Sequence, residues 1–378
     1  MSDKIPGMAV HVSVEQRSQI LGRIDRILEK GWLMWGDEQD ELKRKFCERA
    51  AVDYAETFNS ATSAIEIVGT WLAAAAPDRP PYALVQANSF PSVAMALSRA
   101  GLKPVFVDVD RETMQFSGDV VEEALDVYDA VMVVIQHNGG YVTSGVEDVR
   151  TVCTNRGVFL LEDCSHAAGS KLNGVGVGHW GDAAVFSMAA TKPLQTGQGG
   201  MLLTDDAGLV EFAFRAKNYG RTEMFQKGRY VQDGWNAHLT EIQAAVGNVL
   251  HESLDDAIDY RQRLLSIMED TAGFGFDEIR LGLDPAAEPN LYKVPVVLPS
   301  GVSADEARQV FAEDNIELGS SIYNFVTPDL EVFSGRFDRL DTPNAAWLAE
   351  HHVCLPMHNR MSDDDAVRVG KKIAEVWA

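Results

Sequence analysis

Apolar residues recur along this chain in two distinct patterns. Between about residues 14 and 30 they are spaced three to four positions apart, which predicts an amphipathic helix, and a second helix is expected over residues 38–49. Farther along, they form short runs that do not alternate with polar residues. These runs cover residues 83–85, 104–107, 130–135, 158–161, 183–186 and 201–203. Continuous apolar runs are typical of strands buried on both faces, so they predict a parallel or mixed sheet covered by helices.

Helical patterns separate several of these runs, for example at residues 92–100 and 146–156. We therefore expect an N-terminal helical segment over residues 1–40, then one large α/β domain over residues 41–250. The rest of the chain, residues 251–378, is predicted to be a smaller α+β domain. One or two helices are expected over 239–269, further helices over 303–314 and 363–376, and short strands over 292–298, 316–318 and 352–355.

Composition and charge narrow the class of protein. A chain of 378 residues is long enough for this two-domain plan, and its net charge of -23 argues against nucleic acid or an anionic membrane as partner. No segment has the apolar core of a signal peptide or the ~18 apolar residues of a membrane span. The four cysteines are scattered without a CxxC pair, which indicates a reduced, cytoplasmic protein.

Two residues carry the most informative chemistry. Lys192 lies in a glycine-rich loop, residues 187–200, that follows one apolar run, and Asp163 comes shortly after the run at 158–161. In doubly wound sheets, ligands bind beyond the carboxyl ends of the strands. A lysine that forms a Schiff base and a carboxylate that keeps a pyridine nitrogen protonated are the two groups that a pyridoxal phosphate (PLP) enzyme needs.

The segments around these two residues form short blocks in a fixed order. The main blocks are Glu162-Asp-Cys-Ser-His166-Ala-Ala-Gly169, Gly174-Val-Gly-Val-Gly178-His-Trp-Gly-Asp182, Phe186-Ser-Met-Ala-Ala-Thr-Lys192 and Gln198-Gly-Gly200. Weaker matches are Asn59-Ser-Ala-Thr-Ser-Ala64, Asn218-Tyr-Gly-Arg221, Gly234-Trp-Asn236-Ala-His-Leu-Thr240 and Leu355-Pro-Met-His358. On these blocks, the chain resembles the DegT/DnrJ/StrS sugar aminotransferase family over about residues 30–365.

The resemblance implies a PLP enzyme of fold type I. It implies a mostly parallel central sheet in the large domain, a smaller α+β C-terminal domain, and a homodimer with active sites at the interface. The expected reaction moves an amino group from glutamate or glutamine to a keto-sugar, nucleotide-linked or free, or to a keto-cyclitol. The text of residues 187–192 is closer to the cyclitol and antibiotic branch of the family.

The same resemblance assigns roles to individual residues. Lys192 is expected to bind PLP and to carry the proton between substrate and cofactor, and Asp163 to pair with the pyridine nitrogen. Phe90 is expected to stack on the ring, and His166 to touch its edge. The phosphate is expected to contact Ser60, Ala61, Thr62, Ser187 and, from the partner subunit, Asn236. The candidates for substrate binding are Arg221, Tyr323 and His358.

Two positions depart from the family pattern. Ala61 stands where the family usually has glycine, which makes the approach to a phosphate tighter but keeps the backbone N–H. His238 stands where the family commonly has arginine, so the details of anion binding stay open.

Structural explanations also remain open for these residues. Ser60 suits a helix N-cap and Asp163 a turn, while Phe90 suits core packing. No metal site is expected, because neighbouring residues after a strand rarely converge on one point. We therefore do not expect Asp163, Cys164, His166 and His179 to bind a metal together.

Two other functions fit the same scaffold. One is PLP-dependent sugar dehydration or deoxygenation, although members of the family with that chemistry replace the lysine with histidine, whereas Lys192 is present. The other is a non-catalytic regulatory homologue, against which the intact pair of Lys192 and Asp163 argues.

Overall fold

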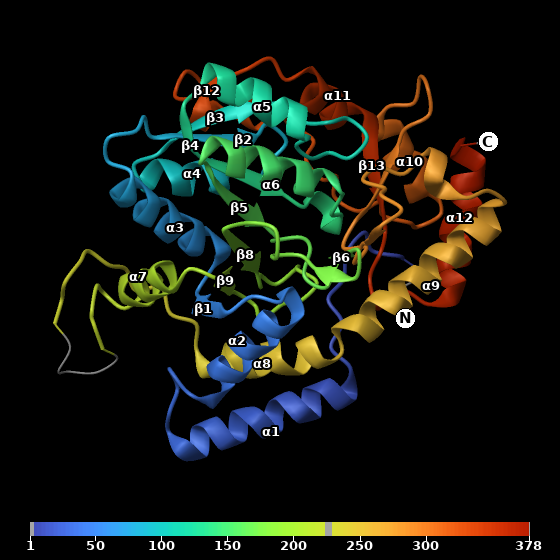
Figure 1. Cartoon of the computed structure of the whole chain (residues 1–378). Coiled ribbons are helices and arrows are strands. Elements are labelled where there is room, and N and C mark those ends of the chain that lie inside the picture. The colour runs from blue at the N-terminus through green and yellow to red at the C-terminus, as the bar shows by residue number, and fades with distance from the viewer. Residues whose placement is uncertain (1–3, 224–228, 378) are drawn as a thin grey trace.

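A large sheet lies at the centre of the molecule (Figure 1). The computed structural model describes residues 4–223 and 229–377. The strands of this sheet are β1 (Tyr54–Phe58), β2 (Tyr82–Gln86), β3 (Lys103–Val107), β4 (Ala130–Gln136), β5 (Phe159–Asp163), β8 (Ala183–Ser187), β9 (Gly200–Thr204) and β12 (Asp338–Arg339). Their order across the sheet is β1-β9-β8-β5-β4-β2-β3-β12.

Most neighbours in this sheet run parallel. Parallel pairing continues from β12 through β3, β2, β4 and β5 to β8, whereas β9 pairs antiparallel with both β8 and β1. Every position of β4 is buried. The continuous apolar runs therefore form strands covered on both faces, and the predicted α/β architecture with a mostly parallel sheet is confirmed.

Helices of the N-terminal two thirds surround the sheet (Figure 1). They are α1 (Val14–Lys30), α2 (Asp37–Ala50), α3 (Ala61–Ala75), α4 (Ser92–Arg99), α5 (Gly118–Val127), α6 (Gly145–Arg156), α7 (Ala207–Lys217) and α8 (Glu241–Glu252), with a short 3-10 turn η1 (Asn138–Gly140). Helix α3 packs against β8 and β9, and α6 against β5. Helix α2 contacts β1, and α8 lies between α2 and α1.

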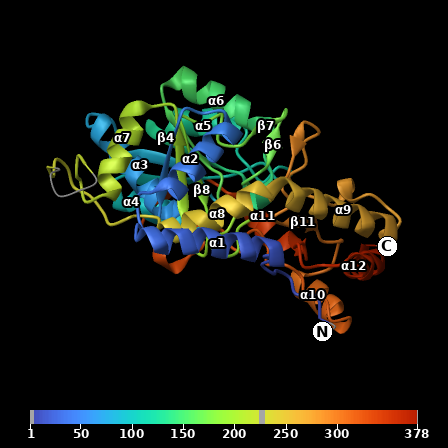
Figure 2. The same cartoon turned by 90° about the horizontal axis from the view of Figure 1, so that it is seen from below.

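Helices α9, α10 and α12 of the C-terminal third lie at one end of the molecule (Figure 2). Its helices are α9 (Leu254–Ala272), α10 (Ala304–Glu313), α11 (Pro343–His351) and α12 (Asp363–Trp377), with 3-10 turns η2 (Phe276–Glu278), η3 (Thr327–Asp329) and η4 (Glu331–Phe333). Strand β11 (Val294–Val297) pairs antiparallel with β13 (His352–Leu355). A small sheet joins β10 (Ala287–Glu288), β6 (Lys171–Leu172) and β7 (Val175–Gly176).

The expected strand at residues 316–318 is wrong. Ile316 and Gly319 make only isolated bridges, with Ile5 and Cys354 respectively, because the chain here passes between two segments without running along either. The predicted domain boundaries stay a prediction, and β12 reaches back from this part to pair with β3. Within residues 4–223 and 229–377, no helix is both long and apolar enough to cross a bilayer.

The first described residues pack against the C-terminal third. Ile5 is 2% exposed and bridges Ile316, and the carbonyl of Pro6 lies 2.9 Å from Nε2 of His358. Helix α1 then begins at a capping box in which Ser13 and Gln16 exchange hydrogen bonds. The N-terminal segment is therefore an integral part of the packed structure.

A buried ion pair joins α7 to β1. Lys217 Nζ lies 2.7 Å from Glu56 Oε1 and donates a second hydrogen bond to the carbonyl of Thr57 at 3.0 Å. The two side chains are 2% and 7% exposed. Burial opposes ionisation of Glu56, but the charges of Lys217 and Lys43 overcome it and hold the pKa of Glu56 below its usual value. This pair explains why β1 escaped the sequence analysis, since a glutamate interrupts its apolar run.

Replacing Glu56 with alanine is expected to lower the free energy of unfolding by about 3–5 kcal/mol, because it strands a buried ammonium without its partner. The control is Glu211→Ala, which removes an exposed pair with Arg215 on the same helix and should cost about 0.5 kcal/mol or less. Denaturant unfolding of both variants measures the difference. Equal losses would contradict a special contribution from the buried pair.

Candidate functional site

A cavity of about 770 Å³ lies at the carboxyl ends of the parallel strands. Nine of the residues singled out from the sequence line it: Ser60, Ala61, Thr62, Phe90, Asp163, His166, Ser187, Lys192 and Tyr323. They come from segments that follow or precede β1, β2, β5 and β8 and from the C-terminal third. The strand-end argument therefore brings these distant residues to one place.

Lys192 is half-buried on the loop that follows β8. Its backbone N–H donates to the carbonyl of Ala189 at 2.9 Å, which turns the chain just before the side chain. Burial lowers the pKa of Lys192 to about 8, the Asp163 carboxylate opposes this change, and the Lys293 ammonium adds to it. A substantial fraction of this amine is therefore neutral near physiological pH, as a nucleophile or a general base requires.

Asp163 is the last residue of β5 and is 5% exposed. Its Oδ2 accepts a hydrogen bond from Gln136 Nε2 at 2.9 Å, and its Oδ1 accepts one from the N–H of Ser165 at 3.0 Å. Gln136 is also the register partner of Asp163 in the β4–β5 pair. The carboxylate is therefore held in a fixed orientation, and each oxygen keeps a lone pair for a further donor.

His166 faces the same cavity as a neutral ring. Burial and the charges of Lys192 and Lys293 hold its pKa well below the usual value. Its Nδ1 accepts a hydrogen bond from the N–H of Gly139 at 3.2 Å, which assigns the ring proton to Nε2. The ring stacks on Tyr323 with centroids 6.3 Å apart. His166 can thus donate one hydrogen bond into the cavity.

The start of α3 supplies the anion-binding end of the cavity. Ser60 is its N-cap and accepts a hydrogen bond from the N–H of Ser63 at 3.1 Å, while Ala61 and Thr62 form the first turn. The first N–H groups of a helix have no acceptor within the helix and favour an anion. Gly200 lets β9 approach this turn, because a Cβ there would lie 2.6 Å from the nitrogen of Ala61.

Two aromatic side chains differ in how the cavity holds them. Tyr323 is buried, and burial together with the Asp163 charge raises the pKa of its hydroxyl well above the usual value. Phe90 is 57% exposed although it lines the cavity. Core packing therefore does not account for Phe90, whose ring faces the open space.

Sequence reasoning missed several residues of this cavity. Gln136 follows the same strand-end rule as Asp163 and was detectable from the apolar run of β4. Lys293, Tyr292 and Arg308 also line the cavity, but they come from the C-terminal third. No local pattern marks them, because only the packing of distant segments brings them here.

Three predicted site residues lie elsewhere. Asn236 and Arg221 belong to the segment between α7 and α8, where bridges join Asn218 to Asn236 and Arg221 to Tyr230. Neither lines the cavity of its own chain. His358 instead lines a second cavity of about 410 Å³, bounded by residues 7–11, α9 and the Lys192 loop.

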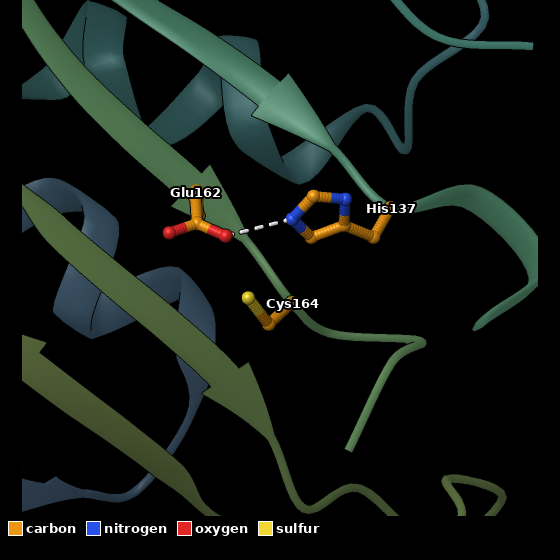
Figure 3. A group of neighbouring side chains, drawn as sticks. All are labelled: His137, Glu162 and Cys164. Atoms are coloured by element: carbon orange, nitrogen blue, oxygen red, sulfur yellow. Dashed lines mark hydrogen bonds and ion pairs between the residues drawn. The ribbon is translucent and has the colours of Figure 1, made fainter. Parts of the chain in front are cut away.

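A buried cluster of His137, Glu162 and Cys164 lies beside the site (Figure 3). Glu162 already accepts three hydrogen bonds: Oε2 accepts from His137 at 2.8 Å and Gly178 at 3.2 Å, and Oε1 accepts from Gly181 at 2.6 Å. Burial and the two neighbouring carboxylates hold the pKa of the Cys164 thiol well above its usual value. These contacts fasten a loop to the end of β5, and the expectation that the protein needs no metal stays a prediction.

Comparison with known proteins points to one family. Residues 14–374 match the DegT/DnrJ/EryC1/StrS aminotransferase family. Among solved structures, the chain is similar to DesI, crystallised in the presence of its TDP-sugar product, with a TM-score of 0.86 and 24% identity over 99% of this chain and 93% of that one. Helicobacter pylori PseC, an aminotransferase of pseudoaminic acid biosynthesis, gives 0.88 and 20% over 99% of both chains. The PLP form of Spr1654 from Streptococcus pneumoniae gives 0.85 and 20% over 98% and 99%.

The lowered pKa of Lys192 predicts how its reactivity depends on pH. In protein freed of bound ligands, acylation of Lys192 should rise with pH and reach half its maximum near pH 8. Free N-acetyl-lysine in the same tube should reach half its maximum near ~10.4, because its amine is fully hydrated. Competitive labelling read by mass spectrometry measures both. Coincident midpoints would contradict a lowered pKa of Lys192.

Proposed function

Because the chain belongs to the DegT/DnrJ/EryC1/StrS aminotransferase family, we propose that it is a PLP-dependent aminotransferase that moves an amino group from glutamate or glutamine to a keto-sugar or keto-cyclitol. One observation carries the proposal. A lysine whose pKa is lowered to about 8 and a fixed carboxylate line the same cavity. These are the two side chains that PLP chemistry requires.

The residues around the cavity fit PLP. The start of α3, with Ser60, Ala61 and Thr62, suits the phosphate, and Ser187 adds a hydroxyl beside the same cavity. The exposed ring of Phe90 offers a face on which a pyridine ring can stack. When bound, PLP supplies an electron sink for the bond changes at the substrate carbon. Ala61 in place of glycine leaves the backbone donor intact.

The protein's own task is to place and move protons. Gln136 and Ser165 orient the Asp163 carboxylate, which would hold a proton on the pyridine nitrogen of bound PLP. Lys192 Nζ takes a proton from one carbon and returns it to another, and an amine whose pKa lies near the working pH can do both. The N–H of Gly139 occupies Nδ1 of His166, so its Nε2–H would be free to donate a hydrogen bond to the edge of a bound ring.

The charge of the cavity supports an acceptor or donor that carries anionic groups. Its cationic lining residues include Lys192, Lys293 and Arg308, whereas Asp163 is the only acidic residue among the described lining residues. This local balance is opposite to the chain's net charge of -23. Nucleotide-linked sugars, sugar phosphates and dicarboxylic amino acids all suit such a cavity.

A homodimer with active sites at the interface completes the proposal. Asn236 is exposed and lies between α7 and α8, in a segment whose described residues project from the body of the chain (Figure 1). The apolar side chains of Tyr219, Tyr230 and Val231 on this segment are exposed as well. Exposed apolar residues on a projecting segment favour contact with a second subunit. Asn236 would then reach the phosphate of the partner's site.

Replacing Lys192 with alanine is expected to abolish both the visible absorbance of lysine-bound PLP and amine transfer. Absorbance spectra and product analysis with glutamate, glutamine and a panel of keto-sugars measure the two effects. The control is Lys371→Ala, an exposed lysine of α12 that should leave both unchanged. Turnover by the Lys192→Ala protein would refute the proposal, and ammonia release without amine transfer would instead indicate deoxygenation.

Mixing two inactive variants tests the role of Asn236 across the interface. If Asn236 acts in the partner's site, a mixture of Lys192→Ala and Asn236→Ala subunits should recover about a quarter of wild-type activity, because half of the dimers then hold one intact site. Each variant alone serves as the control. If Asn236 acts within its own chain, the mixture recovers nothing.

A further inference from the structure

Lys293 is a buried cation without an anionic partner. It precedes β11 and is 8% exposed. Its Nζ donates hydrogen bonds to the carbonyl of Ser320 at 2.7 Å, to Oγ of Ser320 at 2.7 Å and to the carbonyl of Ser321 at 2.9 Å. Across residues 4–223 and 229–377, no carboxylate forms an ion pair with it. Three uncharged oxygens therefore satisfy its three donors and leave its charge unopposed at close range.

Lys293 and Lys192 share one aromatic side chain. Lys192 Nζ lies 5.3 Å from the centre of the Tyr292 ring, and Lys293 Nζ lies 5.8 Å from the same centre. The Tyr292 hydroxyl in turn lies 3.5 Å from Oγ1 of Thr191. Both lysines also line both cavities. Each nitrogen thus lies within 6 Å of the same ring centre. At this range, in a partly buried region, the charge of Lys293 disfavours a second positive charge on Lys192.

We propose that Lys293 is a positioning residue that acts on Lys192 through its charge and keeps the Lys192 amine available in its neutral form. The proposal rests on the proposed function, in which Lys192 is the reacting amine. Lys293 does not itself need to touch substrate, because its three N–H groups are already used. Its role is instead to make a second positive charge beside it unfavourable.

The balance between the two lysines follows from their contacts. An ammonium donates three hydrogen bonds and an amine only two, so the three oxygens around Lys293 favour keeping its proton. The other titratable or charged groups that line this cavity with the two lysines are Asp163, His137, His166, Tyr292, Arg308 and Tyr323, and Cys354 faces Lys293 from β13. Asp163 favours the charged form of Lys192, whereas burial and Lys293 favour the neutral form. His166 is neutral and leaves this balance unchanged.

The experiment measures the acylation midpoint of Lys192 in the full-length protein without PLP. In Lys293→Met, the midpoint should rise by about half a pH unit, because the charge that adds to the larger effect of burial is gone. In Lys293→Arg, which keeps the charge, it should stay at the wild-type value. Ser320→Ala is the structural control, because it removes one oxygen acceptor but leaves the cation in place.

The outcomes separate electrostatic from structural roles. A wild-type midpoint in folded Lys293→Met overturns the proposal. A rise in Lys293→Arg and Ser320→Ala as large as the rise in Lys293→Met also overturns it. If Lys293→Met does not fold, Lys293→Gln, which keeps an N–H donor toward the serine oxygens, gives the same reading. Failure of PLP to bond to Lys192 would refute the proposed function alone, because the labelling is done without PLP.

Discussion

The fixed carboxylate of Asp163 is the constraint on which the site depends. The register of β4 and β5 puts Gln136 opposite Asp163, and the two hydrogen bonds to its oxygens remove its rotational freedom. One residue earlier, Glu162 fastens His137 and the loop at residues 178–181 to the same strand. In the proposed function, a carboxylate held this rigidly would fix the position of the ring nitrogen that pairs with it.

The cavity carries a local charge whose sign is opposite to that of the whole chain. A chain with a net charge of -23 builds a cavity whose lining carries more cations than acids. The positive charge comes from partly buried lysines and from the N-terminus of α3, whose electrostatic effects extend over short distances. A negative net charge and a cation-lined cavity are therefore compatible. Salt screens the interactions of exposed charges, whereas it screens those of buried charges much less.

The sequence predicted what depends on local pattern. Continuous apolar runs located β2, β3, β4, β5, β8 and β9, and the strand-end rule brought Asp163 and Lys192 to one cavity. Local sequence patterns did not reveal a strand or a site residue whose stabilising neighbour lies far away in the chain. β1 contains a glutamate whose closest cationic partner, Lys217, lies 161 residues away in the sequence. Lys293 was invisible for the same reason, because its neighbours come from the Lys192 loop and from residues 320–321.

The docking of the first residues has a practical consequence. Ile5 and Pro6 are anchored on Ile316 and His358, and residues 7–11 form one wall of the smaller cavity that reaches Lys192. Trimming the chain to the beginning of α1 would therefore admit water to the reactive amine from the side of α9. Hydration raises the pKa of an amine, so a smaller fraction of Lys192 would be neutral in the shortened protein even though its strands and helices were intact.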